Sequence, residues 1–483
     1  MEICNSKTIG RRRGSDLAGD VRVAGKRYHC IGAGGIGMSG LARVLALKKA
    51  VVSGSDQEAS AVTDMLWTMG VDVRIGHKAE NLDVATDVVV ISAAIKEDNP
   101  ELKLARERGC RICKYAEMLG ELMDEYEGIA VSGTHGKSTT SGWLTYCLSA
   151  AGLSPSFVIG ADVEQLGGSS GVGNGSLLVA EACEYDRSFL NLRPEIGVIL
   201  NIDRDHLDYY KDEQEIVEAF GAFSNGIRPG GILIANGSDS NAAKVIAGLN
   251  SDLSCETFGF DEGCDYWARD VVLDEGLYNF EVLHKGKSLG QMRTALVGRH
   301  NIDNALAVIG VLVNVGLDGQ EISQVLGGFS GIERRMTLKC EYDGITVLDD
   351  YAHHPTEVRA SLSAVRQKYQ PERLWCVFQP HQYSRTRILL DEFAESFKLA
   401  DVVIVPDIYS ARDSQASKDS VNARMLVDKI CASGTEAVFV DGFERICAYL
   451  QENVRRGDLV ITMGAGDIWK AADEYIQWLR RNS

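Results

Sequence analysis

The stretch Val131-Ser132-Gly133-Thr134-His135-Gly136-Lys137-Ser138-Thr139 decides the fold at the centre of this chain. An apolar, β-branched run at 129–132 leads into it, and a helical pattern follows it. Strand, glycine-rich turn and helix in this order are typical of a phosphate-binding P-loop. Backbone N–H groups of such a turn wrap phosphate oxygens, Lys137 reaches the γ-phosphate, and the Ser138 hydroxyl ligates Mg²⁺. Val131 stands where the usual motif begins with glycine, but the position after a strand still favours phosphate binding.

Apolar strand patterns alternate with helical patterns on both sides of this stretch, which predicts an α/β fold with largely parallel sheets. Strands are expected at 28–31, 50–53 and 88–92, then at 177–180 and 196–200, and finally at 345–348, 374–378, 402–405 and 459–462. These groups divide the chain into three domains. We expect a polar tail at 1–24 and domains at 25–126, 127–330 and 331–483.

A second glycine-rich turn, Gly32-Ala33-Gly34-Gly35-Ile36-Gly37, follows the first expected strand and precedes a helix. Small residues there let a diphosphate approach the backbone N–H groups at the helix N-terminus. Asp56 ends the next strand, where a Rossmann unit places its ribose-binding acid. The segment fits NAD, FAD or the diphosphate of a UDP-sugar, and these alternatives stay open from its residues.

Acidic residues and a histidine follow two strands of the central domain. Glu181 comes directly after 177–180, and Asp203, Asp205 and His206 follow the strand at 196–201. Ligands collect at the carboxyl ends of parallel strands, so these side chains are expected near the P-loop. Mg²⁺ prefers carboxylate oxygen, which favours Glu181 as its ligand, whereas a solvated loop is the alternative reading for each residue.

The last domain carries two polar strings, each expected after a strand and before a helix. Asp349-Asp350-Tyr351-Ala352-His353-His354-Pro355 fits a metal cluster, a group that orients an amine, or a helix cap. His381-Gln382-Tyr383-Ser384-Arg385-Thr386-Arg387 places arginines where they can clamp a carboxylate or a phosphate. The residues themselves do not decide between these roles and a solvated surface.

Composition narrows the class of protein. The chain has 483 residues, of which 45% are hydrophobic and 24% charged, and its net charge is −18. Such a charge disfavours nucleic acid and anionic lipid as partners. No apolar run approaches the roughly 20 residues that span a bilayer, and no signal sequence is recognisable, so a cytoplasmic location is expected. The pair Cys110 and Cys113 lacks a second pair at zinc-ligand spacing, so buried or incidental thiols are expected rather than disulfides or metal.

Taken together, these strings resemble the Mur ligase family, and the resemblance covers nearly all of the chain after about residue 25. The order and spacing of the strings make the resemblance specific. They are GAGGIGMSGLA (32–42), SGTHGKSTT (132–140), EACEYDRSFL (181–190), LNIDRDHLDYY (200–210), GRHNIDNALA (298–307), GIERRM (331–336), DDYAHHPTEV (349–358) and QPHQYSRTR (379–387).

The resemblance implies a Rossmann-like UDP-sugar domain, a P-loop ATPase-type central domain, and a Rossmann-like C-terminal domain that binds the amino acid and completes the ATP site. It implies ATP-dependent ligation of L-alanine to UDP-N-acetylmuramate through an acyl phosphate, with ATP and Mg²⁺ (two ions), in a monomer or homodimer. Sister ligases use a carbamoylated lysine, and the chain has no lysine between Lys211 and Lys244, which favours the alanine-adding branch. A ligase that recycles a tripeptide is the nearest alternative. A nicotinamide oxidoreductase and a non-enzymatic ATP-gated binding protein are remote ones.

The resemblance also implies roles for individual residues. The UDP-sugar would be bound by Gly34, Gly35, Ile36, Gly37, Met38, Ser39, Asp56, His77 and Ser92. ATP would be bound by Gly133 through Thr139 together with His300, Asn304 and Arg335. The metal ligands would be Ser138, Glu181 and His206, and the catalytic residues Lys137, His354, Arg385 and Arg387. Ala352 stands where many members carry glycine, and Gln382 where many carry arginine, which leaves the third-domain roles least defined.

Overall fold

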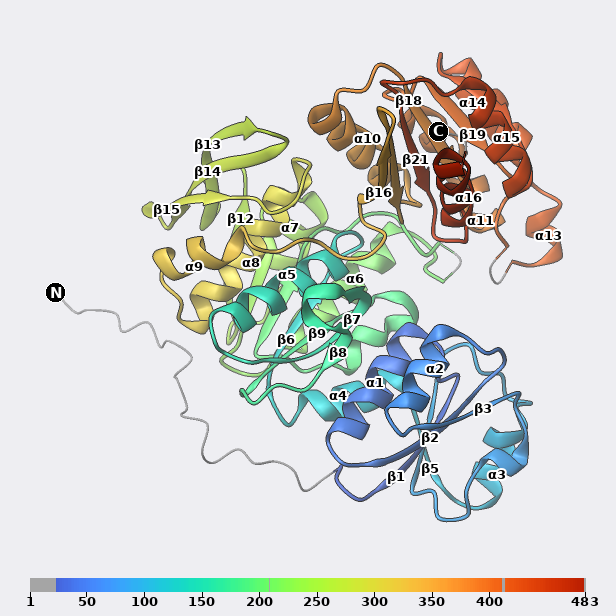
Figure 1. Cartoon of the computed structure of the whole chain (residues 1–483). Coiled ribbons are helices and arrows are strands. Elements are labelled where there is room, and N and C mark those ends of the chain that lie inside the picture. The colour runs from blue at the N-terminus through green and yellow to red at the C-terminus, as the bar shows by residue number, and fades with distance from the viewer. Residues whose placement is uncertain (1–22, 208, 411–412, 482–483) are drawn as a thin grey trace.

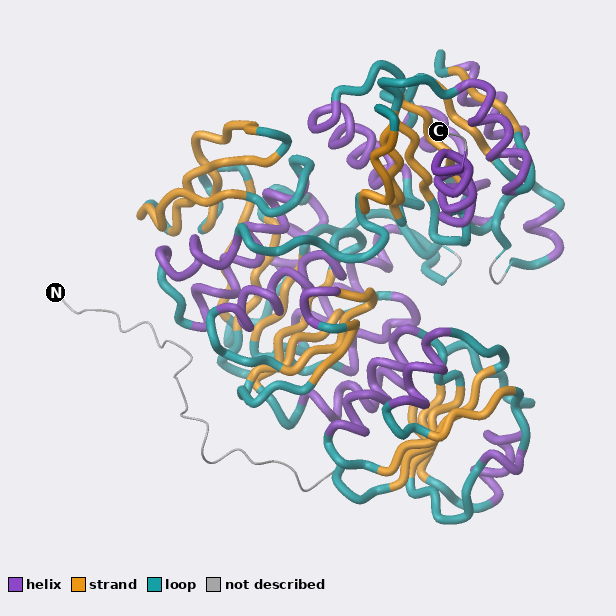
Figure 2. Tube along the Cα trace, viewed as in Figure 1, coloured by secondary structure: helices purple, strands orange, loops and turns teal. Residues whose placement is uncertain are grey.

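The computed structural model describes residues 23–207, 209–410 and 413–481. The chain forms three successive α/β units, each built on its own sheet, and this confirms the predicted fold class (Figure 1). Helices pack beside each sheet (Figure 2). Of the predicted polar tail, only Val23 and Ala24 fall within the described residues.

The first sheet has the strand order β3-β2-β1-β4-β5, and every pairing in it is parallel. Its central strand β1 is buried after its first residue, because helices cover both faces. The strands are β1 (Arg27–Ile31), β2 (Val51–Asp56), β3 (Asp72–Ile75), β4 (Val88–Ile91) and β5 (Arg111–Lys114). The α-helices are α1 (Ile36–Leu47), α2 (Ala61–Thr68), α3 (Pro100–Glu107) and α4 (Tyr115–Met123).

The second sheet is the largest, in the order β15-β14-β13-β12-β11-β10-β6-β9-β7-β8. Its centre is parallel, and antiparallel pairs lie at both ends. The strands are β6 (Glu127–Ser132), β7 (Ser156–Val163), β8 (Gly168–Gly171), β9 (Leu177–Glu181), β10 (Ile196–Ile199), β11 (Ile232–Asn236), β12 (Ser254–Gly259), β13 (Tyr266–Asp274), β14 (Leu277–His284) and β15 (Lys287–Arg293). The α-helices are α5 (Lys137–Ala150), α6 (Glu213–Asn225), α7 (Ser240–Ala247), α8 (His300–Val315) and α9 (Gly319–Leu326).

The third sheet has the order β16-β17-β21-β18-β19-β20, and only β16 pairs antiparallel among these described strands. The strands are β16 (Thr337–Tyr342), β17 (Ile345–Asp350), β18 (Leu374–Phe378), β19 (Val402–Val405), β20 (Glu436–Phe439) and β21 (Leu459–Met463). The helices are α10 (Pro355–Tyr369), α11 (Tyr383–Ile388), α12 (Leu390–Ser396), α13 (Gln415–Lys418), α14 (Ala423–Ala432), α15 (Phe443–Asn453) and α16 (Trp469–Arg481).

Two expectations from the sequence are refined here. Asp349 and Asp350 were expected to follow the strand, but they are the last two residues of β17 and are buried. Cys113 is buried and Cys110 is partly buried, and their thiols point at the backbone carbonyls of Val89 and Thr86. Among the helices of the described residues, none has the length and apolar character needed to cross a membrane.

Candidate active site

The P-loop joins β6 to α5, and two of its glycines adopt positive φ. Gly133 has φ 146° and Gly136 has φ 83°. A Cβ at Gly136 would lie 2.8 Å from Oδ1 of Asn304 in α8. A side chain at this position would therefore contact α8 too closely, and the positive φ would also strain its backbone. Asn201, in the segment that follows β10, holds the loop in place. Its carbonyl accepts the backbone N–H of Thr134 (3.0 Å), and its side-chain oxygen accepts the backbone N–H of His135 (2.8 Å).

Lys137 is tied back onto its own loop. Its ammonium donates to the carbonyls of Gly133 (2.6 Å) and Thr134 (3.0 Å) and to Oε1 of Glu184 (3.1 Å). Burial acts to lower the pKa of Lys137, but the Glu184 carboxylate outweighs it and raises the pKa. Glu184 is a site residue that was not predicted from the sequence. Its one signal was the position three residues after Glu181, in the same strand-to-loop segment.

The predicted metal ligands lie at the carboxyl ends of β9 and β10 and at the start of α5. Glu181 ends β9, and its Oε2 accepts a hydrogen bond from the N–H of Gly160 (2.8 Å). His206 follows β10 with φ 53°, and its Nε2 lies 3.5 Å from Oε1 of Glu184. Ser138 lies in the first turn of α5. Carboxylate and hydroxyl oxygens fit Mg²⁺, so Glu181 and Ser138 suit such an ion better than His206 does.

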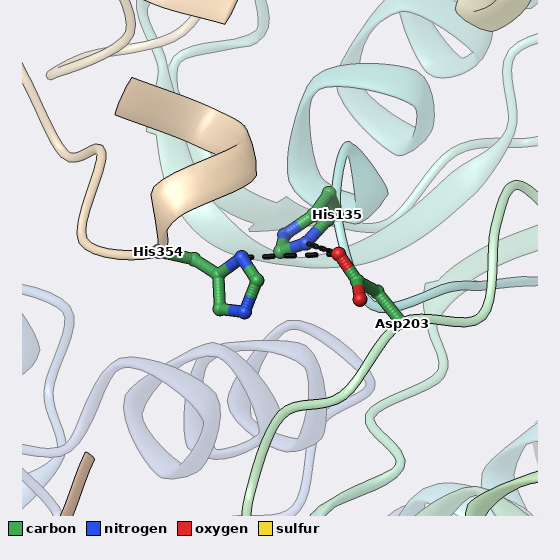
Figure 3. Close-up of side chains that lie close together, drawn as sticks. All are labelled: His135, Asp203 and His354. Atoms are coloured by element: carbon green, nitrogen blue, oxygen red, sulfur yellow. Dashed lines mark hydrogen bonds and ion pairs between the residues drawn. The ribbon is translucent and has the colours of Figure 1, made fainter. Parts of the chain in front are cut away.

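The C-terminal domain meets the P-loop at a group of polar side chains. Figure 3 shows His135, Asp203 and His354 pointing toward one another from the P-loop, the loop after β10 and the start of α10. Nε2 of His135 lies 3.3 Å from Oδ2 of Asp203, which also accepts a hydrogen bond from the Thr356 hydroxyl (2.9 Å). Nε2 of His354 lies 3.1 Å from the Arg204 carbonyl.

These three side chains have the composition of a metal centre, with ligand atoms within 4.8 Å of one another. Their hydrogen bonds indicate another role. Nδ1 of His354 accepts the N–H of Thr356 (3.3 Å) and so caps α10. Burial acts to lower the pKa of His135, but Asp203 and Glu357 outweigh it and raise the pKa to about 9. His135 is therefore a cation between two carboxylates, and the group is an interdomain ionic contact.

The arginines of the C-terminal domain differ in their surroundings. Arg385 donates to Oδ1 of Asp205 through Nε (3.1 Å) and Nη2 (2.8 Å), and both side chains are buried. Arg335 lies 3.3 Å from Oε1 of Glu357, and the carboxylate outweighs the effect of burial and raises the arginine pKa. Arg387 is exposed on α11. The structure thus brings Arg385 and Arg335 to the domain boundary, and leaves Arg387 at the surface.

A cavity of about 680 Å³ opens between the central and C-terminal domains. It is lined by parts of the P-loop, of α8 and of α10. Six of the residues that are expected to bind ATP line this cavity: His135, Gly136, Thr139, His300, Asn304 and Arg335. The P-loop, α8, α10 and the segment that carries Arg335 are far apart in the sequence, and together they line one space.

The glycine-rich turn of the first domain is closed by the predicted acid. Oδ2 of Asp56 accepts the N–H of Gly34 (2.7 Å), and a Cβ at Gly32 would lie 2.9 Å from Oγ of Ser92. His77 lies 3.0 Å from the Ser55 hydroxyl and 3.3 Å from the buried Glu101. The turn, Asp56 and Ser92 therefore lie together. Of the other expected UDP-sugar residues, Ile36 is exposed, whereas Met38 and Ser39 are buried.

Comparison with protein families gives three consecutive matches. Residues 27–127 match the Mur ligase family catalytic domain, residues 131–312 the Mur ligase middle domain, and residues 334–466 the Mur ligase glutamate ligase domain. Together they span nearly all of the described chain.

Two whole-chain relatives carry the same name. The chain is 40% identical over 454 residues to a UDP-N-acetylmuramate–L-alanine ligase of Caldanaerobacter subterraneus subsp. tengcongensis, covering 94% of this chain and 97% of the relative. It is 42% identical to the protein of that name from Alkaliphilus metalliredigens, covering 92% and 96%. Among solved structures, a UDP-N-acetylmuramate-alanine ligase of Thermotoga maritima superposes with a TM-score of 0.80 at 27% identity, over 95% of this chain and all of the other. A murein peptide ligase of Psychrobacter arcticus shares the fold, with a TM-score of 0.70 at 24% identity over 94% of this chain and 99% of the other.

Proposed function

Because the chain belongs to the Mur ligase family, we propose that it joins L-alanine to the carboxylate of UDP-N-acetylmuramate, while ATP is hydrolysed to ADP and phosphate. The observation that carries this proposal is the agreement of full-length relatives at about 40% identity on one activity. The P-loop beside a cavity shared by two domains supports it, since ligation needs a phosphate site that can be closed from water.

In the proposed reaction the sugar carboxylate attacks the γ-phosphate and displaces ADP, which gives an acyl phosphate. The neutral amine of alanine then attacks the acyl carbon, and phosphate leaves with one carboxylate oxygen as the amide forms. Such chemistry depends on positioning and on charge neutralisation. Lys137 would exchange Glu184 and its loop carbonyls for phosphate oxygens as ATP enters. Ser138, Glu181 and His206 would hold Mg²⁺, which would neutralise charge on the transferred phosphoryl group.

The first domain would hold the UDP diphosphate at its glycine-rich turn. The N–H groups at the start of α1 face such an anion by the same physics that serves the P-loop. Asp56 would keep the turn in shape through its bond to Gly34 (2.7 Å), whereas His77 and Ser92 would contact the rest of the sugar nucleotide.

The C-terminal domain would bind L-alanine and supply the group that accepts the proton of its amine. Burial lowers the pKa of His354, so its imidazole is neutral near pH 7 and can accept a proton. Nδ1 now caps α10 at Thr356, and the incoming amine would have to take the place of that N–H. Arg385, paired with Asp205 of the central domain, would hold the C-terminal domain against the P-loop while the amine attacks.

The test is phosphate release from Mg-ATP with UDP-N-acetylmuramate present and amines added one at a time. The proposal predicts release that needs the sugar nucleotide and is fastest with L-alanine rather than glycine or serine. Release that responds only to a tripeptide would assign the recycling reaction instead. Absence of release with every amine would contradict ligase activity.

A further inference from the structure

Six acidic side chains line the cavity between the central and C-terminal domains, and five of them have partners. Asp239 caps α7, and Asp350 accepts the N–H groups of Met336 and Ala352. Asp203 and Glu357 bind His135, and Glu275 lies 3.9 Å from Arg293. The sixth is Asp303, and no hydrogen bond or ion pair joins it to any residue in 23–207, 209–410 or 413–481.

Asp303 lies on a helix whose neighbouring residues are buried, and its own side chain is partly exposed to the cavity. It belongs to the first turn of α8, where Asn301, Ile302 and Asn304 on either side are buried. Burial raises the pKa of Asp303 to about 7, and the nearby Arg299 lowers it only in part. Arg299 stacks on the ring of Phe260, with its guanidinium carbon 4.3 Å from the ring centroid, rather than pairing with Asp303.

A partly buried acid that has no partner within the described residues gains stability when a ligand supplies a hydrogen-bond donor. A carboxylate repels a triphosphate, so its partner must come from the nucleoside end of the nucleotide. Donors at that end are the 6-amino group of adenine and the ribose hydroxyls. His300 and Asn304 flank Asp303 in the same helical turn, and the family resemblance implies that they contact adenine. The base is therefore the nearer source of a donor.

We propose that Asp303 is a further specificity-determining residue, whose side chain accepts a hydrogen bond from the 6-amino group of adenine. The proposal rests on the proposed function, because it takes this cavity as the ATP site. Inosine triphosphate differs from ATP at this position by an acceptor oxygen in place of the amino group. The wild-type protein should therefore bind ATP more tightly than inosine triphosphate, and Asp303 should cause the difference.

The experiment measures the dissociation constants of ATP, inosine triphosphate and 2′-deoxy-ATP by calorimetry with the full chain. Asp303→Asn offers an amide N–H₂ to the inosine oxygen, so the preference for ATP should fall by about 10-fold or more. Asp303→Leu should weaken ATP binding without creating that new contact. Glu262→Gln, at an exposed acid of the same domain, makes the same change of charge and should leave the preference unchanged.

An ATP-to-inosine preference in Asp303→Asn within about 2-fold of wild type would overturn the proposal. A change confined to 2′-deoxy-ATP would also overturn it, since it would assign Asp303 to the ribose. Thermal unfolding curves of the free variants check that each variant is folded. Because binding is measured without turnover, failure of the ligase reaction would leave this test intact, and the two proposals can fail separately.

Discussion

The pair of Arg385 and Asp205 should control closure of the C-terminal domain over the P-loop. Two hydrogen bonds of 3.1 and 2.8 Å join side chains that are 8% and 7% exposed, and the residues belong to different domains. Burial acts to raise the pKa of Asp205, but Arg385 and neighbouring histidines hold it well below its usual range. The pair is therefore charged and shielded from water, where removal of one partner is most costly.

Asp205→Asn keeps the shape of the side chain and removes its charge. Loss of one partner of a buried pair costs about 3 kcal/mol at the lower end of the usual range. If this cost falls on the closed state, the ratio of closed to open molecules drops about 100-fold, because about 1.4 kcal/mol corresponds to a factor of ten. Since the acyl phosphate forms only in the closed state, kcat/KM for L-alanine should fall by a similar factor.

The assay is phosphate release over a range of L-alanine concentrations, combined with small-angle X-ray scattering of the ligand-free protein. Asp401→Asn is the matched control, because Asp401 binds Arg366 at 2.6 Å within the C-terminal domain alone. The dependence on Mg²⁺ concentration should stay as in wild type, which separates closure from damage to the neighbouring His206. An Asp205→Asn enzyme within about 3-fold of wild type, or an equal loss in Asp401→Asn, would refute the reasoning.

Three further changes test other parts of the site. The pKa of His135 is raised to about 9. The charged imidazole therefore contributes fully to closure below about pH 6.5, and this contribution is lost as the pH rises through about 9. Affinity for an ATP analogue should fall between about pH 8 and 10 in wild type but not in His135→Gln. Gly136→Ala should weaken ATP binding about 10-fold through strain and contact with Asn304, whereas Gly152→Ala, with similar φ (+79°) and open space, should not. Glu184→Gln should lower the melting temperature of the free protein, because Lys137 loses its buried partner. The variant should gain more stability from Mg-ATP than wild type does, because phosphate would replace that partner. An unchanged stabilisation by ATP would contradict this role.

The parts that the sequence predicted are those with local causes. The strands at Leu374–Phe378 and Val402–Val405 are short apolar runs bounded by polar residues, and the structure has them with the expected bounds. The P-loop was recognisable because its glycines, lysine and serine are adjacent in the chain. Three parallel-sheet domains followed from the alternation of such runs.

The parts that it could not predict depend on long-range pairing. Asp205 and Arg385 are 180 residues apart, and Asp203 and Thr356 are 153 apart, so no local pattern indicates that they meet. Glu184 could not be distinguished in the sequence from other loop acids, because its contact with Lys137 forms only in the folded chain. The end of β17 was misjudged for a related reason: Asp349 and Asp350 are polar, yet Arg334 and Ser361 from outside the strand satisfy them and allow burial.

The most direct test of the central claim is oxygen-isotope transfer. UDP-N-acetylmuramate labelled with ¹⁸O in its carboxylate is incubated with the protein, Mg-ATP and L-alanine, and the products are analysed by mass spectrometry. Ligation through an acyl phosphate predicts one labelled oxygen in the released phosphate and L-alanine attached to the sugar nucleotide. Amide formation with unlabelled phosphate, or label found in AMP, would contradict the account.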